Sequence, residues 1–386
     1  MTINGYRRDD GSVGVRDYVA VLPTVGCVNV AAMRIAEQVA SARPFLHHQG
    51  CCQLSPDLET VRTVLTGLGR NPNVKAVLLV SLGCESVSAE EIQAAISPYK
   101  PVELVRLQEL GGLSETVSEG VSLVESMASI EAERVEVDVS DLTIGVKCGA
   151  SDTTSGLAAN PAVGRAIDTF VDAGATAIFG ETTEVMGAEH VLSKRAVTDS
   201  VAEEIYQKVT EMEERADRFG VDMRGGQPTE GNIKGGLTTI EDKSLGAIQK
   251  SGSRPIDGVL EYGESPTKSG LYFMDSPGRE MEFLTGPTAA GAQIILFPTG
   301  IGAPQGFPLV PVIKITGNTN TASHLEEHID LDVSQIISGT ESTDEAGERV
   351  VDSVRRVADG ERVKAEVAGY DDAGTNSAIY VCGPVI

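Results

Sequence analysis

Aromatic side chains are scarce in this sequence of 386 residues: they make up 4% of it, and tryptophan is absent. The hydrophobic fraction of 41% therefore comes mostly from Ala, Val, Ile and Leu, which is typical of layered α/β proteins. Basic residues are also few, since 31 Lys and Arg stand against 56 Asp and Glu, giving a net charge of −25. This charge would repel a phosphate backbone, so nucleic acid is not an expected partner.

Long apolar runs are missing as well. No stretch reaches the roughly 20 consecutive apolar residues of a membrane span. The N-terminal MTINGYRRDDGSVGVRDY has no apolar segment behind its positive charges, unlike a secretory signal. We therefore expect a cytoplasmic protein without membrane contact. The six cysteines are then reduced, and they are interpreted as thiols, metal ligands or packing residues instead of disulfides.

Short apolar runs alternate with amphipathic segments along the whole chain. This pattern predicts an α/β fold with parallel sheets in Rossmann-like layers and helices on both faces. The length predicts two domains, residues 1–139 and 140–386, divided near the polar segment 128–141. The expected strands are 18–24, 76–83, 101–107, 142–149, 175–180, 292–300 and 310–316. The expected helices are 28–41, 57–69, 88–97, 116–133, 160–174 and 188–219, with long loops at 220–240 and 251–270.

Sulfur and carboxylate side chains lie at the ends of several predicted strands. They are Cys27, Cys84, Glu85, Cys148 and Glu181. Because the carboxyl ends of parallel strands share one edge of a sheet, these groups are expected to meet there. The polar segment HHQGCCQLSPD at 47–57 could add His47 and Cys51 to the same edge.

Thiolate, imidazole and carboxylate donors together predict a site for iron, zinc or manganese instead of magnesium or calcium. A single cysteine is more often a small packing residue, and Cys52 and Cys382 are interpreted in that way. Cys51, Cys84 and Cys148 together favour a metal site. Two further readings stay open: an iron–sulfur redox enzyme, and a scaffold or ligand-binding subunit without catalysis.

The segment KCGASDTTSGLAANPAVG at 147–164 places hydroxyl groups and backbone N–H groups just before a helix. Such a segment suits an anion, for example a substrate carboxylate. It is neither a P-loop nor GxGxxG, so it does not predict nucleotide binding. Lys314 could also grip a carboxylate or sulfonate, or it could be an edge lysine. The candidate substrate-binding residues are Ser151, Asp152, Thr153, Asn160 and Lys234.

Eight segments in order resemble the altronate and galactarate dehydratase family. They are NGYRRDDGSVGVRDYVAVLPTVGC, HHQGC, GRNPNVKAVLLVSLGCE, KCGASDTTSGLAANPAVGRAID, GETTEVMGAEHVLSKRA, GGLTTIEDKSLGAIQKSG, YFMDSPG and SGTESTDEAGERV. Together they cover nearly the whole chain, which makes the resemblance more specific than any one motif. It implies a lyase that removes the proton next to a carboxylate and expels a group from the neighbouring carbon. It also implies a divalent metal, with Fe²⁺ expected and Mn²⁺ as the alternative.

The resemblance, with the residue chemistry, gives the candidate site. The predicted catalytic residues are His47, Glu85, Glu181, Glu184 and Lys314. The predicted metal ligands are His47, Cys51, Cys84, Cys148 and His190. His47 is the expected base because imidazole titrates near neutral pH, with metal ligation as an equal alternative.

The sequence departs from the family in two respects. It begins directly at the family's second domain, which implies the large subunit of a split enzyme, with a small partner that carries the missing N-terminal domain. Phe307 and Val333 also stand where the family has cysteines, which indicates a more apolar pocket. Elimination of sulfite from (2R)-3-sulfolactate to give pyruvate is therefore favoured. The alternative is a sugar-acid dehydratase that yields a 2-keto-3-deoxy acid.

Overall fold

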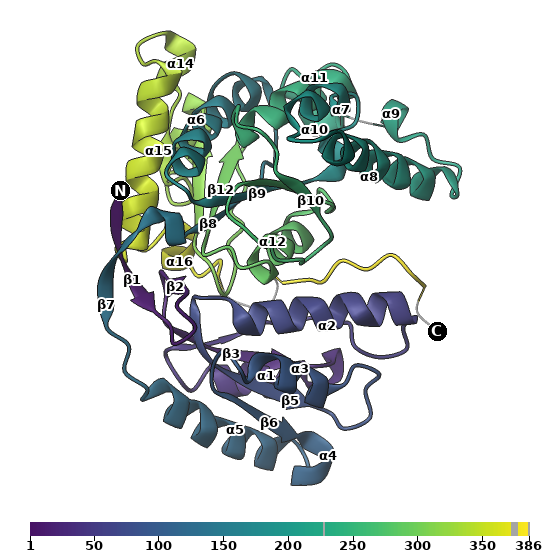
Figure 1. Cartoon of the computed structure of the whole chain (residues 1–386), viewed down its shortest axis with the longest axis vertical. Coiled ribbons are helices and arrows are strands. Elements are labelled where there is room, and N and C mark those ends of the chain that lie inside the picture. Colours follow the sequence, from purple (N-terminus) through teal and green to yellow (C-terminus); the bar gives the residue numbers. More distant parts are fainter. Residues whose placement is uncertain (227, 372–376, 385–386) are drawn as a thin grey trace.

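The computed structural model describes residues 1–226, 228–371 and 377–384, and a seven-stranded parallel sheet lies at its centre (Figure 1). The strand order is β10-β11-β9-β8-β12-β13-β14, with all neighbours parallel. The strands are β8 (Thr143–Val146), β9 (Thr176–Phe179), β10 (Gly258–Leu260), β11 (Leu271–Met274), β12 (Ile294–Thr299), β13 (Val312–Thr316) and β14 (Leu331–Asp332). β8, β9 and β11 to β13 are buried almost throughout, as expected of strands that are covered on both faces.

A second parallel sheet of four strands has the order β4-β3-β5-β6. Its strands are β3 (Tyr18–Pro23), β4 (Ala42–Pro44), β5 (Val74–Ser81) and β6 (Val102–Arg106). Parallel sheets flanked by helices confirm the predicted α/β fold class.

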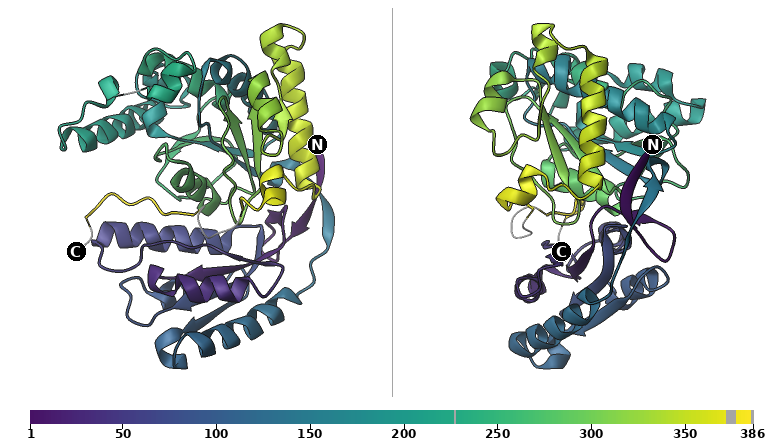
Figure 2. Two further views of the ribbon diagram at one scale, coloured as in Figure 1. Left: turned by 180° about the vertical axis from the view of Figure 1, so that it is seen from behind. Right: turned by 90° about the vertical axis from the view of Figure 1, so that its left-hand side faces the viewer.

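A small antiparallel sheet of β1 (Thr2–Arg7), β2 (Val13–Gly14) and β7 (Arg134–Asp138) was not predicted from the sequence. β7 lies in the polar segment that was expected to divide the chain. Its partner β1 comes from the N-terminus, so the chain returns to its own start before it enters the seven-stranded sheet (Figure 2). The domain boundary between residues 139 and 140 stays a prediction.

The helices cover both large sheets. Those of the first part are α1 (Asn29–Ala36), α2 (Ser55–Arg70), α3 (Ala89–Ile96), α4 (Leu107–Leu110) and α5 (Leu113–Ala128). Those of the second part are α6 (Asn160–Asp172), α7 (Glu189–Leu192), α8 (Asp199–Asp217), α9 (Met223–Gly226), α10 (Glu230–Lys234), α11 (Ile240–Ala247), α12 (Glu280–Ala289), α13 (Thr319–His324), α14 (Gln335–Ser338), α15 (Thr343–Ala358) and α16 (Lys364–Ala368).

Local sequence explains where several helices begin. Ser342 caps α15 and forms a capping box with Glu345, and the Thr198 hydroxyl accepts from the Val201 N–H at the start of α8. The expected single helix at 188–219 is wrong, because Thr198 starts a new helix and splits the segment into α7, a 3₁₀ turn and α8. The expected loop at 220–240 contains the short helices α9 and α10. Within the described residues, no helix is long and apolar enough to cross a bilayer.

One apolar cluster joins the two large sheets. α2 packs against α12, and the ring of Phe45 lies 5.9 Å from that of Phe307, centroid to centroid. Both rings belong to a buried cluster that draws residues from both halves of the chain. Asn73 adds two side-chain hydrogen bonds, to the carbonyls of Gln293 and Leu309. The two sheets are therefore fixed relative to each other by a shared core.

Candidate active site at the edge of the seven-stranded sheet

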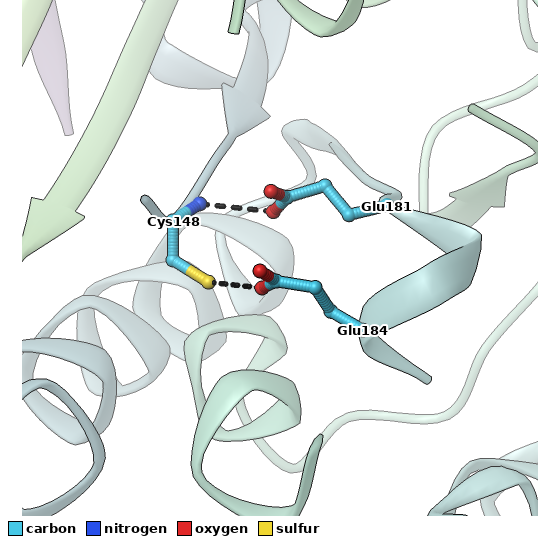
Figure 3. Close-up of side chains that lie close together, drawn as sticks. All are labelled: Cys148, Glu181 and Glu184. Carbon is cyan, nitrogen blue, oxygen red and sulfur yellow. Dashed lines mark hydrogen bonds between the residues drawn. The ribbon is translucent and has the colours of Figure 1, made fainter. Parts of the chain in front are cut away.

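Three predicted site residues meet at the carboxyl edge of the seven-stranded sheet (Figure 3). Cys148 follows β8, Glu181 follows β9, and Glu184 lies in the 3₁₀ turn after it. β8 and β9 are parallel neighbours, so their ends bring these side chains together as the sequence predicted. One ligand atom from each residue lies within 4.8 Å of the others, and all three residues are buried.

Glu181 is held rigidly beneath this edge. Its carboxylate accepts hydrogen bonds from Lys147 Nζ, Lys250 Nζ and, at 2.9 Å, the Cys148 N–H. Its backbone is left-handed, with φ 71°, and its N–H donates to Ser276 Oγ at 2.9 Å. A left-handed glutamate is strained, and it persists here because these contacts fix both the main chain and the side chain.

Glu184 connects the thiol to a lysine. Cys148 Sγ donates to Glu184 Oε2 at 2.8 Å, and Lys243 Nζ lies 3.4 Å from Glu184 Oε1. Burial acts to raise the pKa of Glu184, but the charges of Lys243, Lys250 and Lys147 outweigh it and lower the pKa to about 2. Glu184 is therefore a carboxylate at any physiological pH.

The thiol is neutral in this arrangement. Burial raises the pKa of Cys148, and the charges of Glu181 and Glu184 raise it further. Burial acts to lower the pKa of Lys250, whose Nζ lies 3.1 Å from Cys148 Sγ, but the surrounding acidic groups outweigh it and raise the pKa. A cation at this position would take the place of the thiol proton.

The donor set fits a transition-metal ion. One sulfur and two carboxylate oxygens suit iron, zinc or manganese better than magnesium, and their spacing allows a single ion. Both oxygens of Glu181 already accept from lysines, so an ion would share Glu181 with two ammonium groups. Cys148, Glu181 and Glu184 form the one such group found among the described residues, and it could hold a metal ion.

A cavity of about 450 Å³ lies beside this group. Four of the predicted substrate-binding residues line it: Ser151, Asp152, Thr153 and Asn160. Asn160 is buried, and its Oδ1 has no hydrogen-bond partner, whereas its Nδ2 donates to the Gly246 carbonyl at 2.8 Å. Lys243 lines the cavity and pairs with Glu184, so it links the cavity to the thiol and carboxylates.

Asp152 stabilises the wall of this cavity through hydrogen bonds that its carboxylate accepts. Its Oδ1 accepts from Thr154 Oγ1 at 2.6 Å and from the Ser155 N–H at 3.0 Å. Its Oδ2 accepts from Asn318 Nδ2 at 2.8 Å. These bonds satisfy the donors at the start of the helical segment that leads into α6, which fixes the cavity wall.

The remaining predicted residues lie elsewhere. Lys234 and His190 are exposed, and neither lines the cavity. Phe307 and Val333 belong to the core, with exposed fractions of 1% and 0%, so their apolar character does not bear on the cavity.

Lys314 is fully buried and fastens a loop. Its Nζ donates to the carbonyls of Pro304 at 3.1 Å and Gln305 at 2.6 Å. Burial lowers its pKa to about 8, although Asp330 acts to raise it.

Lys314 gives a pH-dependent contribution to stability. Its pKa is about 8 in the folded chain against 10.5 for an ordinary lysine, so between these values the unfolded chain binds more protons. Stability from this group therefore rises with pH across that window, by about 1.4 kcal/mol per pH unit. We expect urea unfolding at pH 8 and pH 10 to show this gain in the wild type and its loss in Lys314→Met. Equal pH dependence in both proteins would contradict the assignment.

The predicted residues of the first half gather at the other sheet. His47 Nε2 lies 2.7 Å from the Pro23 carbonyl and its Nδ1 accepts from the Gln49 N–H at 3.1 Å, so both ring nitrogens are occupied. Burial lowers the pKa of His47 to about 4, which keeps the imidazole neutral. Glu85, Cys51 and Cys84 follow strands of the four-stranded sheet, and they do not join the Cys148 group.

Comparison with known proteins covers almost the whole chain. Residues 5–131 match the second domain of D-galactarate dehydratase/altronate hydrolase, and residues 139–379 match the C-terminal domain of D-galactarate/altronate dehydratase. The chain belongs to the D-galactarate/altronate dehydratase family. The resemblance predicted from the sequence is thereby confirmed, and the chain is an enzyme of the lyase class.

The chain covers a different share of the length of each relative. The (2R)-sulfolactate sulfo-lyase subunit beta of Chromohalobacter salexigens is 39% identical over 374 residues, which is 96% of this chain and 95% of that protein. The altronate dehydratase of Bacillus subtilis is 35% identical over 82% of this chain and 66% of that protein. The altronate dehydratase of Escherichia coli is 33% identical over 92% and 74%.

Sequence reasoning missed three lysines of this candidate site: Lys147, Lys243 and Lys250. Two of them lie in the segment IEDKSLGAIQK, where charged residues alternate with apolar ones as in an ordinary surface segment. Lys147 directly precedes Cys148, and a charged residue within an apolar strand end was a usable signal. Lys147 and Lys250 are fully buried, which is rare for lysine unless it is paired.

Proposed function

We propose that the chain is the large catalytic subunit of a lyase that converts (2R)-3-sulfolactate to pyruvate and sulfite. The observation that carries this proposal is the match in length: the chain spans 95% of a sulfo-lyase subunit beta, but 66% and 74% of two altronate dehydratases. An identity of 39% supports the same reaction class.

The reaction is a β-elimination. A base takes the proton from C2, next to the carboxylate, and a double bond forms between C2 and C3. The C3–S bond breaks, and its electron pair leaves with sulfite. The resulting enol takes up a proton at C3 and loses its hydroxyl proton, which gives pyruvate. Charge develops on the substrate carboxylate during proton removal, so the site needs fixed positive groups near it.

The cavity and its lysine supply such a group. An anionic substrate in the cavity would meet the Lys243 ammonium, which already lies beside Glu184. Asn160 also lines this cavity, and its Nδ2 is held by the Gly246 carbonyl. Lys147 and Lys250 hold Glu181 in place, and Lys250 also contacts the thiol.

We propose ferrous iron as the metal, with Mn²⁺ as the alternative. Cys148, Glu181 and Glu184 would hold it, since they combine a soft donor with two carboxylates. When bound, such an ion acts as a Lewis acid that stabilises negative charge on an oxygen of the substrate. The proposed partner is a small subunit, because the relative with the matching length is named as a subunit beta.

Replacing Lys243 tests the proposed substrate contact. Lys243→Met is expected to raise KM by roughly 10- to 100-fold and to change kcat less, because a hydrogen bond to a charged group contributes about 1.5–3 kcal/mol. Lys234→Met is the matched control, since Lys234 is exposed and does not line the cavity. Steady-state kinetics that show equal effects in both variants would contradict this contact.

One assay distinguishes the proposed functions. The chain is combined with its small partner and ferrous iron without oxygen, and 3-sulfolactate and altronate are offered separately. Release of sulfite and pyruvate from sulfolactate alone is the expected result. A 2-keto-3-deoxy acid from altronate would favour a split sugar-acid dehydratase, which the identities with altronate dehydratases support as the second candidate. Turnover by the partner without this chain would favour a scaffold role.

A further inference from the structure

Four of the six cysteines lie at the carboxyl edge of the four-stranded sheet, away from the proposed active site. Cys27 follows β3, Cys51 and Cys52 lie in the loop after β4, and Cys84 follows β5. All four are exposed, whereas Cys148 is buried at the other sheet. β4, β3 and β5 are parallel neighbours, so these loops emerge side by side.

Hydrogen bonds and close backbone contacts connect the three loops that follow β3, β4 and β5. The N–H groups of Ser86 and Val87 donate to the Gly50 carbonyl at 3.0 and 3.2 Å, and the Cys52 N–H donates to Ser86 Oγ at 3.4 Å. Gly50 has φ 107°, and a Cβ there would lie 2.3 Å from the Thr24 carbonyl oxygen. Glycine is therefore required for the thiol-bearing loop to approach the end of β3.

Two predicted catalytic residues brace this edge. Glu85 accepts from Thr24 Oγ1 at 2.5 Å and from the Gly83 N–H at 2.7 Å, which ties the end of β5 to the end of β3. His47 ties the loop after β4 to β3 through the Pro23 carbonyl. Both side chains fix the positions of the cysteines, and this gives them a role that does not require direct contact with a substrate.

Three of the thiols, those of Cys27, Cys51 and Cys52, are close enough for the first two to influence the third. Cys51 Sγ and Cys52 Sγ are 3.6 Å apart, and Cys84 Sγ accepts from Gln108 Nε2 at 3.4 Å. The contact with Cys51 raises the pKa of Cys52, and Cys27 raises it further. Soft thiolates in such a group select soft or borderline metals and iron–sulfur clusters.

The spacing favours a centre with several metal atoms over a single ion. Thiolates bound to a single zinc or iron ion lie at most about 4.6 Å from one another, because each metal–sulfur bond is about 2.3 Å long. Among the described residues, the donor group whose atoms all lie within 4.8 Å of one another is Cys148 with Glu181 and Glu184, and it includes none of these four cysteines. A cluster of several irons bridged by sulfide keeps its thiolate ligands farther apart than one ion does.

We infer that Cys27, Cys51, Cys52 and Cys84 form a thiolate site for a polynuclear iron–sulfur cluster at the edge of the four-stranded sheet. Each coordinating thiol gives its proton to solvent, while iron and sulfide come from outside the chain. This site is distinct from the Cys148 group, and the inference does not rest on the proposed lyase reaction.

The test uses the full chain with its small partner, reconstituted without oxygen with ferrous iron, sulfide and a thiol reductant, then desalted. We expect several irons and a matching amount of acid-labile sulfide to stay bound per chain. Each of the four single variants, Cys27→Ser, Cys51→Ser, Cys52→Ser and Cys84→Ser, is expected to lose bound sulfide. Far-ultraviolet circular dichroism checks that the variants fold, which is expected because the replaced side chains are exposed.

Two control variants distinguish the proposed cluster site from the other cysteines of the chain. Cys382→Ser changes another exposed cysteine that lies outside the cluster, and it is expected to retain iron and sulfide. Cys148→Ser is expected to lose turnover but to retain the sulfide, so failure of the lyase proposal and failure of this inference give different results. Binding of one iron without sulfide would overturn the inference. Full sulfide retention in all four serine variants of the cluster would overturn it too.

Discussion

Glu181→Gln is expected to lower the free energy of unfolding by roughly 3–5 kcal/mol, the usual result of removing one partner from a buried ion pair. Glu181 has an exposed fraction of 0%, and it faces the ammonium groups of Lys147 and Lys250, which are exposed by 1% and 2%. Glutamine keeps the shape but not the charge. Two buried ammonium groups would then lack their main counter-charge in a region without water access.

Urea unfolding of the purified chain measures this effect. The matched control is Glu203→Gln on the exposed side of α8, which is expected to change stability by no more than about 0.5 kcal/mol. In the Glu181→Gln background, Lys250→Met should recover part of the loss, because it removes one unpaired charge. Equal stability of Glu181→Gln and the wild type would show that this carboxylate does not carry a charge in the folded chain.

Glu184→Gln is expected to lower kcat by more than roughly 100-fold and to reduce the amount of iron bound. Replacing a residue that only supports a metal ligand typically lowers metal affinity or activity by about 10- to 100-fold. Replacing a residue that itself offers a ligand atom is therefore expected to lower them further. Glu184 is a carboxylate because its pKa is about 2, and it contacts both the thiol and the lysine that lines the cavity. The amide removes a negative charge from the donor set.

Sulfite release and iron content are measured on the same preparation of the two-subunit complex. Glu189→Gln serves as the control, since Glu189 is similarly buried and pairs with Arg224 at 2.7 Å outside the donor group. It is expected to keep turnover close to that of the wild type. Normal turnover in Glu184→Gln would remove Glu184 from the reaction centre.

The position of the proposed active site could be predicted in part from the sequence. Cys148 and Glu181 follow apolar runs that are parallel neighbours in the sheet, and the rule that ligands bind beyond the carboxyl ends of strands placed them together. The strands themselves were predictable because short runs of Val, Ile and Leu that alternate with amphipathic segments are typical of buried parallel strands between helices. The segment 147–164 was predicted to suit an anion because its hydroxyl and backbone N–H groups precede a helix, and part of this segment lines the cavity.

The division of the cysteines between two sheets could not be predicted. Cys51, Cys84 and Cys148 all lie near strand ends, but the sequence does not say which strands share a sheet. The sequence also carried no sign that β1 and β7, which are short and partly polar, pair over a separation of more than 100 residues. The expectation that donors from the whole first half meet at one cation is therefore wrong: the compact donor group holds Cys148 with Glu181 and Glu184.

Burial also separates residues that look equivalent in sequence. Lys314 donates to two backbone carbonyls and so holds a loop, while Lys250 contacts a carboxylate and a thiol. A free histidine has a pKa suited to a base, but burial lowers the pKa of His47 to about 4, and both of its ring nitrogens already have hydrogen-bond partners. Such roles follow from tertiary contacts, which a single sequence does not specify.

The most direct test of the proposed reaction centre is anomalous X-ray diffraction at the iron edge, from crystals of the active two-subunit complex grown without oxygen. An iron peak is expected at Cys148, Glu181 and Glu184, beside the cavity lined by Asn160 and Lys243. A fully active complex whose crystals show no iron, zinc or manganese at these three residues would contradict it.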